Sequence, residues 1–370
     1  MKRACTLVLT FLVFVFCFDT TACAKTLSIS AQAYVLYCVE NDSVILEHNA
    51  ETKMKMASTT KIMTTLLALE KAQENDCLVE FNEDMIAEGS SMYLKVGDTV
   101  HLSDLAVGMM MCSGNDAANA VALTLSDSIE GFAKLMNKKA KKLRMENTNF
   151  VTPSGLDDEN HYSTALDMAR LMEKALLNEQ FAKITSSTSL SVDFLSPQKS
   201  VTYQNHNRLL NMYEYCIGGK TGFTKAAGRC LVSASKKDGV TLICVTFNAP
   251  SDWNDHIAMY NYGFEKLSAV DTDDSEENFY VDVVGSDKSK IPLFCENGPP
   301  VVVEKDKLKK VKREVYIPKF LYAPISYNDF VGAVTYTLDG EIIAQNSLYA
   351  MEDVDAKRKN KFALFLSNIF

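Results

Sequence analysis

The sequence predicts an α+β protein with a larger part that mixes strands and helices and a smaller all-β part. Strand-like runs come first, helical patterns follow, and two more strand-like runs precede a last helix. This order does not alternate regularly, as a parallel βαβ series would. The composition then changes at residues 270–278, and short alternating runs separated by turn residues follow. That second pattern is typical of a small β domain.

Residues 1–24 have the pattern of an export signal. Two basic residues near the start precede an apolar run over 7–18, and small residues at 22–24 suit cleavage. The run is too short to be a good membrane span, so a cleaved secretory signal peptide is favoured over an uncleaved anchor. The mature chain, residues 25–370, is therefore expected at the outer face of the cytoplasmic membrane or in the cell wall space.

The composition narrows the possible functions. Hydrophobic residues make up 47% of the chain and the net charge is −9, which argues against nucleic acid as a partner. Seven cysteines lie beyond the signal, widely spaced and without a CxxC motif, and are interpreted as small buried hydrophobes. The five histidines form no HExxH motif, so we expect no metal and no other cofactor.

Periodicity predicts the elements of the larger part. Two strands occupy 27–48, and a helix with a long apolar run follows them. Further helices are predicted over 103–111, 115–126, 129–143 and 165–178, strands over 229–236 and 239–249, and a closing helix over 256–267. Ser103 is the expected N-cap of the first of these helices, and Ser163 or Thr164 that of the fourth. An antiparallel sheet flanked by helices, with a helical insertion, fits this order.

The smaller part begins after an acidic stretch. Five acids within seven residues of 270–278 predict a solvated linker or turn, and residues 278–352 are predicted to form a small β-rich domain. In the basic stretch 305–313, basic residues alternate with apolar ones. This pattern favours the solvent-exposed face of one strand over a binding patch. Residues 353–370 place four basic residues before apolar ones spaced along one helix face. A C-terminal amphipathic helix on a membrane surface is favoured over one docked on its own domain.

Ser58 and Lys61 are the first pair that could carry chemistry. They stand three residues apart where a helix begins, so both side chains emerge on one face. A neutral lysine amine could take the serine proton, provided that burial or a nearby cation lowers its pKa. The same spacing recurs at 196–199 and 233–236, but no long apolar helix follows there.

Two further motifs strengthen this interpretation. Ser113-Gly114-Asn115 comes next along the chain, and Lys220-Thr221-Gly222 opens a strand. Ser-x-x-Lys, Ser-x-Asn and Lys-Thr-Gly in this order form the signature of penicillin-binding proteins and serine β-lactamases. On these motifs, and on the stretches ASTTKIMTTLLALE, GLDDENHYSTALDMARL and KTGFTKAAGRC, the chain resembles the low-molecular-mass penicillin-binding proteins that are serine-type D-alanyl-D-alanine carboxypeptidases.

This resemblance implies a fold, domains and partners. It implies a β-lactamase/transpeptidase-like catalytic domain over 25–272, with an antiparallel sheet between helical layers and a helical subdomain. Residues 278–352 and the amphipathic tail, 353–370, match the family's second domain and membrane anchor more loosely. The implied partners are a peptidoglycan stem peptide ending in D-Ala-D-Ala, β-lactam antibiotics and, through the tail, a membrane surface.

The resemblance also implies catalytic roles for three side chains. Ser58 would attack the carbonyl carbon of the penultimate D-alanine and form an acyl-enzyme. Lys61 would be the general base that accepts the serine proton. Ser113 would relay a proton to the departing D-alanine.

Five more residues would bind the substrate. Asn115 would hold Lys61 and a substrate amide, and Lys220 and Thr221 would attract the terminal carboxylate. Gly222 would permit close approach of the substrate backbone, which would lie along this edge strand. The backbone N–H of Phe223, with that of Ser58, would form the oxyanion hole.

Several conspicuous residues receive no catalytic role. His206 stands where some relatives carry a carboxylate-binding arginine, and Arg208 is two positions further on; neither is assigned. Asp157 and Asp158 resemble a metal pair but are expected to shape a loop. Cys112 is expected to pack beneath the loop that carries Ser113.

Other functions share parts of this pattern. A serine β-lactamase of class A would need a Glu-x-x-Leu-Asn motif between Ser113 and Lys220, which the sequence lacks; the nearest string, at 173–178, falls within a predicted helix. A non-catalytic wall-binding relative would have lost at least one motif residue, and none is lost. An endopeptidase acting on peptide cross-links remains a compatible side activity.

Overall fold

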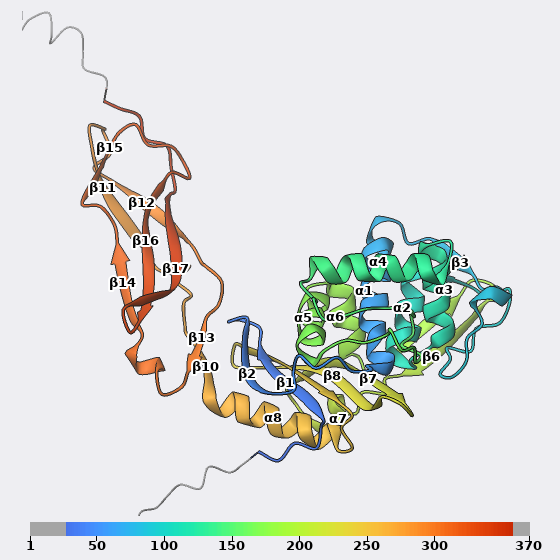
Figure 1. Ribbon diagram of the computed structural model, residues 1–370. Coiled ribbons are helices and arrows are strands. Elements are labelled where there is room, and N and C mark those ends of the chain that lie inside the picture. Colours follow the sequence, from blue (N-terminus) through green and yellow to red (C-terminus); the bar gives the residue numbers. More distant parts are fainter. Residues whose placement is uncertain (1–26, 358–370) are drawn as a thin grey trace, which may run out of the picture.

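The computed structural model describes residues 27–357 (Figure 1). The predicted signal peptide and residues 358–370 of the predicted amphipathic tail lie outside this range. Of the tail, Val354 is described, and its backbone pairs with that of Ile325 in an isolated bridge.

The larger part is built on a five-stranded antiparallel sheet in the order β2-β1-β9-β8-β7. Its strands are β1 (Ala33–Cys38), β2 (Ser43–His48), β7 (Cys216–Thr224), β8 (Gly228–Lys237) and β9 (Val240–Phe247). The central strands β8 and β9 are buried on both faces and are rich in Val, Ile, Leu and Ala, as expected for strands covered on both sides. Strand β7 is an edge strand.

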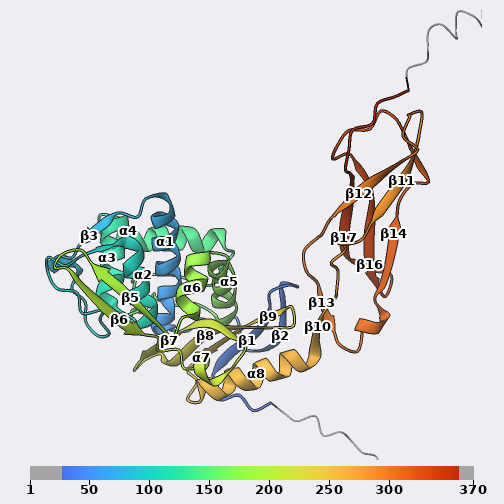
Figure 2. The same cartoon turned by 180° about the vertical axis from the view of Figure 1, so that it is seen from behind.

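Helices cover both faces of this sheet. They are α1 (Lys61–Glu74), α2 (Leu102–Met111), α3 (Asn115–Leu125), α4 (Ile129–Lys142), α5 (Ala165–Leu176), α6 (Glu179–Ser186), α7 (Leu209–Met212) and α8 (Asp252–Lys266). In Figures 1 and 2, α1 to α6 lie on one side of the sheet and α8 runs along the other. The predicted antiparallel sheet between helical layers is confirmed.

Short elements complete the larger part. They are the 3-10 turns η1 (Ala57–Thr60) and η2 (Glu83–Met85), the pair β3 (Leu78–Glu80) and β4 (Thr99–His101), and the hairpin β5 (Ser189–Phe194) and β6 (Lys199–Gln204). Neither the β5–β6 hairpin nor helix α6 was predicted, because their sequences are short and mostly polar. Thr164 caps α5 as expected, its hydroxyl accepting the N–H of Asp167.

The smaller part contains a six-stranded sheet in the order β14-β16-β17-β12-β11-β15. Its strands are β11 (Phe279–Val284), β12 (Lys290–Glu296), β14 (Lys312–Tyr316), β15 (Phe320–Tyr322), β16 (Phe330–Leu338) and β17 (Glu341–Ala350). A short pair, β10 (Leu267–Ala269) and β13 (Val302–Glu304), lies where the two parts join. There the Asn41 side chain bonds both backbone groups of Val302. The predicted C-terminal all-β domain is confirmed.

Three local predictions were wrong. Helix α2 begins at Leu102, so Ser103 is not its N-cap; Asp76 instead accepts the backbone N–H and hydroxyl of Ser103. The acidic stretch is not wholly solvated, because Asp274 is buried. The basic stretch 305–313 is not one strand: a 3-10 turn, η3 (Leu308–Lys310), interrupts it before β14.

Asp274 is buried because distant residues satisfy its charge. The guanidinium of Arg313 donates to Asp274 Oδ1 from Nε at 2.9 Å and from Nη2 at 2.8 Å. The Tyr336 hydroxyl donates to the same oxygen at 3.0 Å, and the Asn346 amide donates to Oδ2 at 2.6 Å. A buried carboxylate needs such partners to offset its lost hydration, so part of the acidic stretch belongs to the β domain's polar core.

Candidate active site

Ser58 lies on η1, the turn that leads directly into α1. Lys61, the first residue of α1, turns its side chain back toward it, and Lys61 Nζ lies 3.0 Å from Ser58 Oγ. The turn is held by the loop at 152–156: a Cβ on Gly155, whose φ is +85°, would collide with the backbone oxygen of Ala57. A glycine is therefore required for this loop to approach the Ser58 turn.

The Lys61 amine is completely buried among polar partners. Besides Ser58, its Nζ lies 2.7 Å from Asn115 Oδ1 and 2.8 Å from the backbone oxygen of Ser154. Burial is the main reason that the pKa of Lys61 is held well below its ordinary value, and the nearby Lys220 lowers this pKa further. Both causes disfavour the protonated amine.

The Ser113-Gly114-Asn115 motif forms the turn between α2 and α3. Ser113 has a φ of +61°, which is unusual for a residue with a Cβ. The backbone is therefore strained at this residue, and the strained conformation sets the direction of the Ser113 side chain. Its hydroxyl lies 3.1 Å from Lys220 Nζ. Asn115 opens α3 and donates its side-chain amide to the backbone oxygen of Glu88, which leaves Oδ1 facing Lys61.

The Lys220-Thr221-Gly222 motif lies on the edge strand β7 beside η1. A Cβ on Gly222 would lie 3.0 Å from the backbone nitrogens of Ser58 and Thr59, so the strand needs glycine to lie this close to the turn. Lys220 is buried, and burial lowers its pKa to about 7. The three motifs, far apart in sequence, thus meet around Ser58.

A cleft of about 300 Å³ opens over these groups. Among the predicted residues, Ser58, Ser113, Thr221, Gly222 and Phe223 line it. Lys61 and Lys220 do not line the cleft but are hydrogen-bond partners of Ser58 and Ser113, and Asn115 in turn accepts a hydrogen bond from Lys61.

Comparison with known proteins identifies the family. The model of the D-alanyl-D-alanine carboxypeptidase family matches residues 19–251, and the model of the penicillin-binding protein 5 C-terminal domain matches residues 264–356. The chain belongs to the D-alanyl-D-alanine carboxypeptidase family. The two matches together also account for its two-part architecture.

Individual members of this family resemble the chain over most of its length. The D-alanyl-D-alanine carboxypeptidase DacF of Bacillus subtilis is 32% identical over 92% of this chain and 90% of its own. DacC of Escherichia coli is 33% identical with the same coverage of both chains. The solved penicillin binding protein 5 of Haemophilus influenzae is 29% identical, with a TM-score of 0.65 over 89% of this chain and 98% of its own.

Five further residues line this cleft and were not assigned a role from the sequence. They are Ser90, Arg229, Asp252 and Trp253, together with the unassigned His206. Arg229 Nη2 lies 2.8 Å from Asp252 Oδ1, and the guanidinium lies over the Trp253 ring. Arg229 pairs with Phe223 across the β7–β8 hairpin, a register that the short connection after the Lys-Thr-Gly motif could have indicated.

The remaining unassigned residues lie beside the cleft rather than in it. Arg208 lines a neighbouring hollow. Asp157 accepts the Thr224 hydroxyl at 3.0 Å, and Asp158 accepts the backbone N–H of Asn160 at 2.7 Å, so both shape the loop as expected. Cys112 donates its thiol to the backbone oxygen of Gly108. Within residues 27–357 no cluster of three or more acidic, histidine or cysteine side chains is arranged to hold a metal ion.

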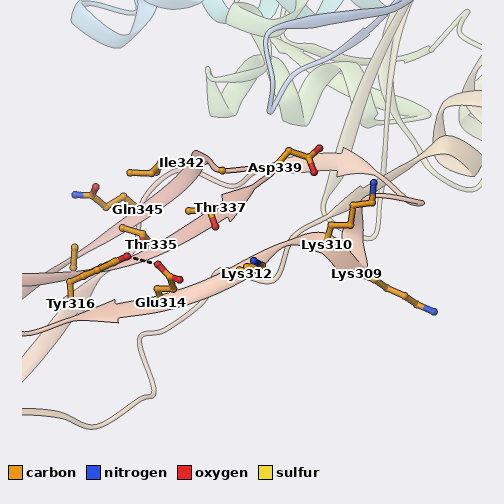
Figure 3. Close-up of a pocket in the computed structure, with 12 residues that line it drawn as sticks. Lys309, Lys310, Lys312, Glu314, Tyr316, Thr335, Thr337, Asp339, Ile342 and Gln345 are labelled. Atoms are coloured by element: carbon orange, nitrogen blue, oxygen red, sulfur yellow. Dashed lines mark hydrogen bonds between the residues drawn. The ribbon is translucent and has the colours of Figure 1, made fainter.

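A second, larger hollow lies away from this site, on the β domain. It measures about 980 Å³ and is lined by residues of η3, β14, β16 and β17, including Lys312, Tyr316, Thr335 and Gln345 (Figure 3). Its twelve lining residues include no Ser, Cys or His. It therefore does not repeat the serine–lysine pair formed by Ser58 and Lys61.

His161 supports the turn that carries Ser58. Its Nδ1 accepts the backbone N–H groups of Val151 and Thr152 at 2.9 and 3.2 Å, so Nε2 carries the proton. Nε2 lies 2.8 Å from the Thr60 hydroxyl, which itself donates to the backbone oxygen of Ala57. The neutral imidazole thus ties the 152–156 loop to the Ser58 turn, and burial lowers its pKa to about 4.

This buried histidine predicts acid sensitivity. In the unfolded chain the imidazole has a pKa near 6.5 and binds a proton below that pH. In the folded protein the same imidazole binds a proton only near pH 4. The contribution of neutral His161 to the free energy of unfolding is therefore complete above pH 6.5 and decreases as the pH falls below that value. We expect His161 to account for a loss of about 2 kcal/mol between pH 7 and pH 5, measurable by urea unfolding at both values.

The matched variants isolate this contribution. His161→Gln is expected to be less stable at pH 7. Between pH 7 and pH 5 its free energy of unfolding should fall by about 2 kcal/mol less than that of the unchanged protein. His48→Gln, a change at an exposed histidine, is expected to leave the pH dependence unaltered. If His161→Gln loses as much stability on acidification as the unchanged protein, another group is responsible.

Proposed function

We propose that the chain is an exported serine-type D-alanyl-D-alanine carboxypeptidase that removes the terminal D-alanine from peptidoglycan stem pentapeptides through an acyl-enzyme on Ser58. The observation that carries this proposal is the environment of Lys61. A neutral amine has two N–H groups and one lone pair. Asn115 Oδ1 and the Ser154 carbonyl can take the two N–H groups, which turns the lone pair toward Ser58 Oγ.

Acylation follows from this arrangement. Ser58 Oγ attacks the carbonyl carbon of the penultimate D-alanine while its proton passes to Lys61 Nζ. The oxyanion that develops accepts hydrogen bonds from the backbone N–H groups of Ser58 and Phe223. The C–N bond then breaks, and the proton held by Lys61 passes through the hydroxyl of Ser113, which lies 3.1 Å from Lys220, to the departing D-alanine amine, so that Lys61 is neutral again.

Deacylation regenerates the enzyme. Water attacks the Ser58 ester and gives a proton to Lys61. As the ester C–O bond breaks, Lys61 returns this proton to Ser58 Oγ, and the peptide leaves one residue shorter. Lys220 serves in both steps, because its charge disfavours protonated Lys61 and attracts the substrate carboxylate together with Thr221. A β-lactam follows the first step only, since ring opening acylates Ser58 without releasing a leaving group.

The rival functions find less support. A class A β-lactamase needs a glutamate over the ester, whereas Glu173 lies within α5 and its carboxylate accepts a hydrogen bond from Tyr37. A wall-binding protein without activity would not need a buried lysine and its buried partners beside a serine. Hydrolysis therefore explains the site better than binding alone.

The proposal is tested by measuring D-alanine released from a diacyl-Lys-D-Ala-D-Ala peptide by residues 25–370. A fluorescent penicillin provides an independent readout, with mass spectrometry to locate the adduct. Release together with an adduct on Ser58 is the expected result. An adduct on Ser58 without any release would retain the acylation step but contradict the proposed substrate.

We further propose that the mature protein associates with a membrane through its C-terminal tail. The tail sequence, KRKNKFALFLSNIF over 357–370, has the basic and apolar composition of an interfacial helix. Within residues 27–357 no helix is both long and apolar enough to span a bilayer. Deletion of 358–370 is expected to abolish co-sedimentation with anionic liposomes while D-alanine release from a soluble peptide is retained; equal sedimentation would contradict the proposal.

A further inference from the structure

Four aromatic side chains stand in a row on the outer face of the β domain. They are Phe294, Tyr327, Phe330 and Tyr349, named here the aromatic row. Tyr349 pairs across the strands with Phe294 on one side and Phe330 on the other, with ring centroids 5.4 and 5.9 Å apart. Tyr327 stacks on Phe294 at 6.2 Å. The row therefore crosses three neighbouring strands, β16, β17 and β12.

The aromatic row continues onto the other edge of the sheet. Tyr280 on β11 pairs with Pro292, two residues before Phe294 on β12, so it lies on the same face. Phe320 and Tyr322 follow on the edge strand β15, with ring centroids 5.3 Å apart. The exposed fractions are 63% for Phe330, 60% for Tyr327, 70% for Tyr322, 48% for Tyr280 and 44% for Phe320.

This face is not the domain's core. The side chains that alternate with it, such as Leu293 and Leu348, point to the opposite face and are 3% and 0% exposed. The β domain thus has a complete apolar core and, in addition, an aromatic surface across five strands. So many exposed aromatic side chains on one face of a folded domain mark an interaction surface.

The aromatic surface lies at the end of the domain from which the chain continues toward residue 370. The Tyr327 backbone N–H bonds Asp353, and the Lys357 N–H bonds the backbone oxygen of Gly285, which follows β11. In Figure 1 this end, marked by β15 and β11, lies opposite the end that joins the larger part. The aromatic surface and the beginning of the basic and apolar tail sequence therefore share one end of the molecule.

The other end of the same sheet face is polar. On β17, Gln345 and Ser347 point to the same side as Tyr349, since they alternate with the buried Asn346 and Leu348. There the hollow of Figure 3 is lined by Thr335, Gln345 and Lys312, and Tyr316, which pairs with Ala333, lines its side nearer the aromatic row. Aromatic side chains are thus concentrated where the tail begins and give way to polar ones toward the catalytic domain.

We propose that the aromatic surface is a membrane-interface contact, seated in the headgroup region of the bilayer beside the tail. Tyrosine suits that region because its ring is apolar and its hydroxyl stays hydrated, and aromatic residues are enriched there in membrane proteins. Lys290, whose Nζ lies 5.0 Å from the Tyr280 ring centroid, adds a cation that anionic headgroups attract. The tail alone is one weak anchor, and stable anchoring generally takes two signals.

This contact would orient the enzyme as well as hold it. With the β15 end on the bilayer, the β domain stands between the membrane and the catalytic domain (Figure 1). The catalytic domain, which carries the Ser58 cleft, then lies away from the lipid surface. The inference extends the proposed membrane association but does not depend on the chemistry at Ser58.

The test uses residues 25–370 with the tail intact. The variant Tyr327→Ser/Phe330→Ser removes the two most exposed rings of the aromatic row. The matched control Leu177→Ser/Ile342→Ser changes two residues that are 75% and 60% exposed and lie away from the aromatic row, Leu177 on the catalytic domain and Ile342 beside Thr337 at the polar end of the sheet. Co-sedimentation is measured with vesicles of phosphatidylcholine and phosphatidylglycerol, and, separately, with purified peptidoglycan.

We expect the aromatic variant to lose about tenfold in vesicle partitioning, and the control to bind like the unchanged protein. Both should keep the same thermal unfolding midpoint and the same D-alanine release from a soluble peptide, which separates this inference from the proposed catalysis. Vesicle binding equal to that of the unchanged protein would overturn the inference. So would loss of peptidoglycan binding with vesicle binding retained, since the aromatic surface would then contact the wall.

Discussion

Ser58→Ala is expected to abolish both D-alanine release and labelling by a fluorescent penicillin. The substitution removes the oxygen that forms the acyl bond, and within residues 27–357 the only hydroxyl bonded to Lys61 Nζ is that of Ser58. Loss of a nucleophile that works with a dedicated base typically costs about 10⁴-fold or more in rate. Because Ser58 is partly exposed on a short turn, the variant should remain folded.

Ser196→Ala is the matched control for this substitution. Ser196 and Lys199 repeat the Ser-x-x-Lys spacing, but they lie in and beside the β5–β6 turn, and Lys199 Nζ bonds Asp98 instead of the serine. Release and labelling should therefore be unchanged in Ser196→Ala. Residual activity in Ser58→Ala within tenfold of the unchanged protein would contradict the assignment of the nucleophile.

The motif residues could be predicted because their order in the sequence is itself the signal. Ser58, Lys61, Ser113 and Lys220 meet as expected. Their supports could not be predicted in the same way. The Ser154 carbonyl that contacts Lys61 is a backbone group. Because every residue has one, the amino-acid sequence does not indicate which carbonyl will contact Lys61.

The same limit applies to the fold. Elements with strong periodicity, such as the buried helix α1 and the central strands β8 and β9, were predicted from their own sequences. Asp274 was placed in a solvated linker because composition describes only its neighbours along the chain. Its partners Tyr336 and Asn346 follow 62 and 72 residues later, so its burial depends on tertiary contacts that no local pattern reports.

The second large effect is expected for Lys61→Arg, which replaces the neutral amine with a permanently charged group and so removes the base. Arginine is not deprotonated in proteins, whereas the proposed mechanism needs a neutral amine with a lone pair toward Ser58 Oγ. We expect acylation by fluorescent penicillin to slow by about 10³-fold or more, a size typical of losing a general base and the geometry that it imposes. D-alanine release should fall in parallel, because the same amine serves in both steps.

Two further variants make this result specific. Lys71→Arg, on the same helix but exposed, should acylate at the unchanged rate. Lys61→Met replaces the amine with an apolar side chain of similar length that suits a fully buried position, so a thermal unfolding midpoint near that of the unchanged protein would show that lost activity is not lost folding. If Lys61→Arg still acylated within tenfold of the unchanged rate, a permanently charged group at this position would be enough for acylation of Ser58. The lowered pKa of Lys61 would then serve another purpose than base catalysis.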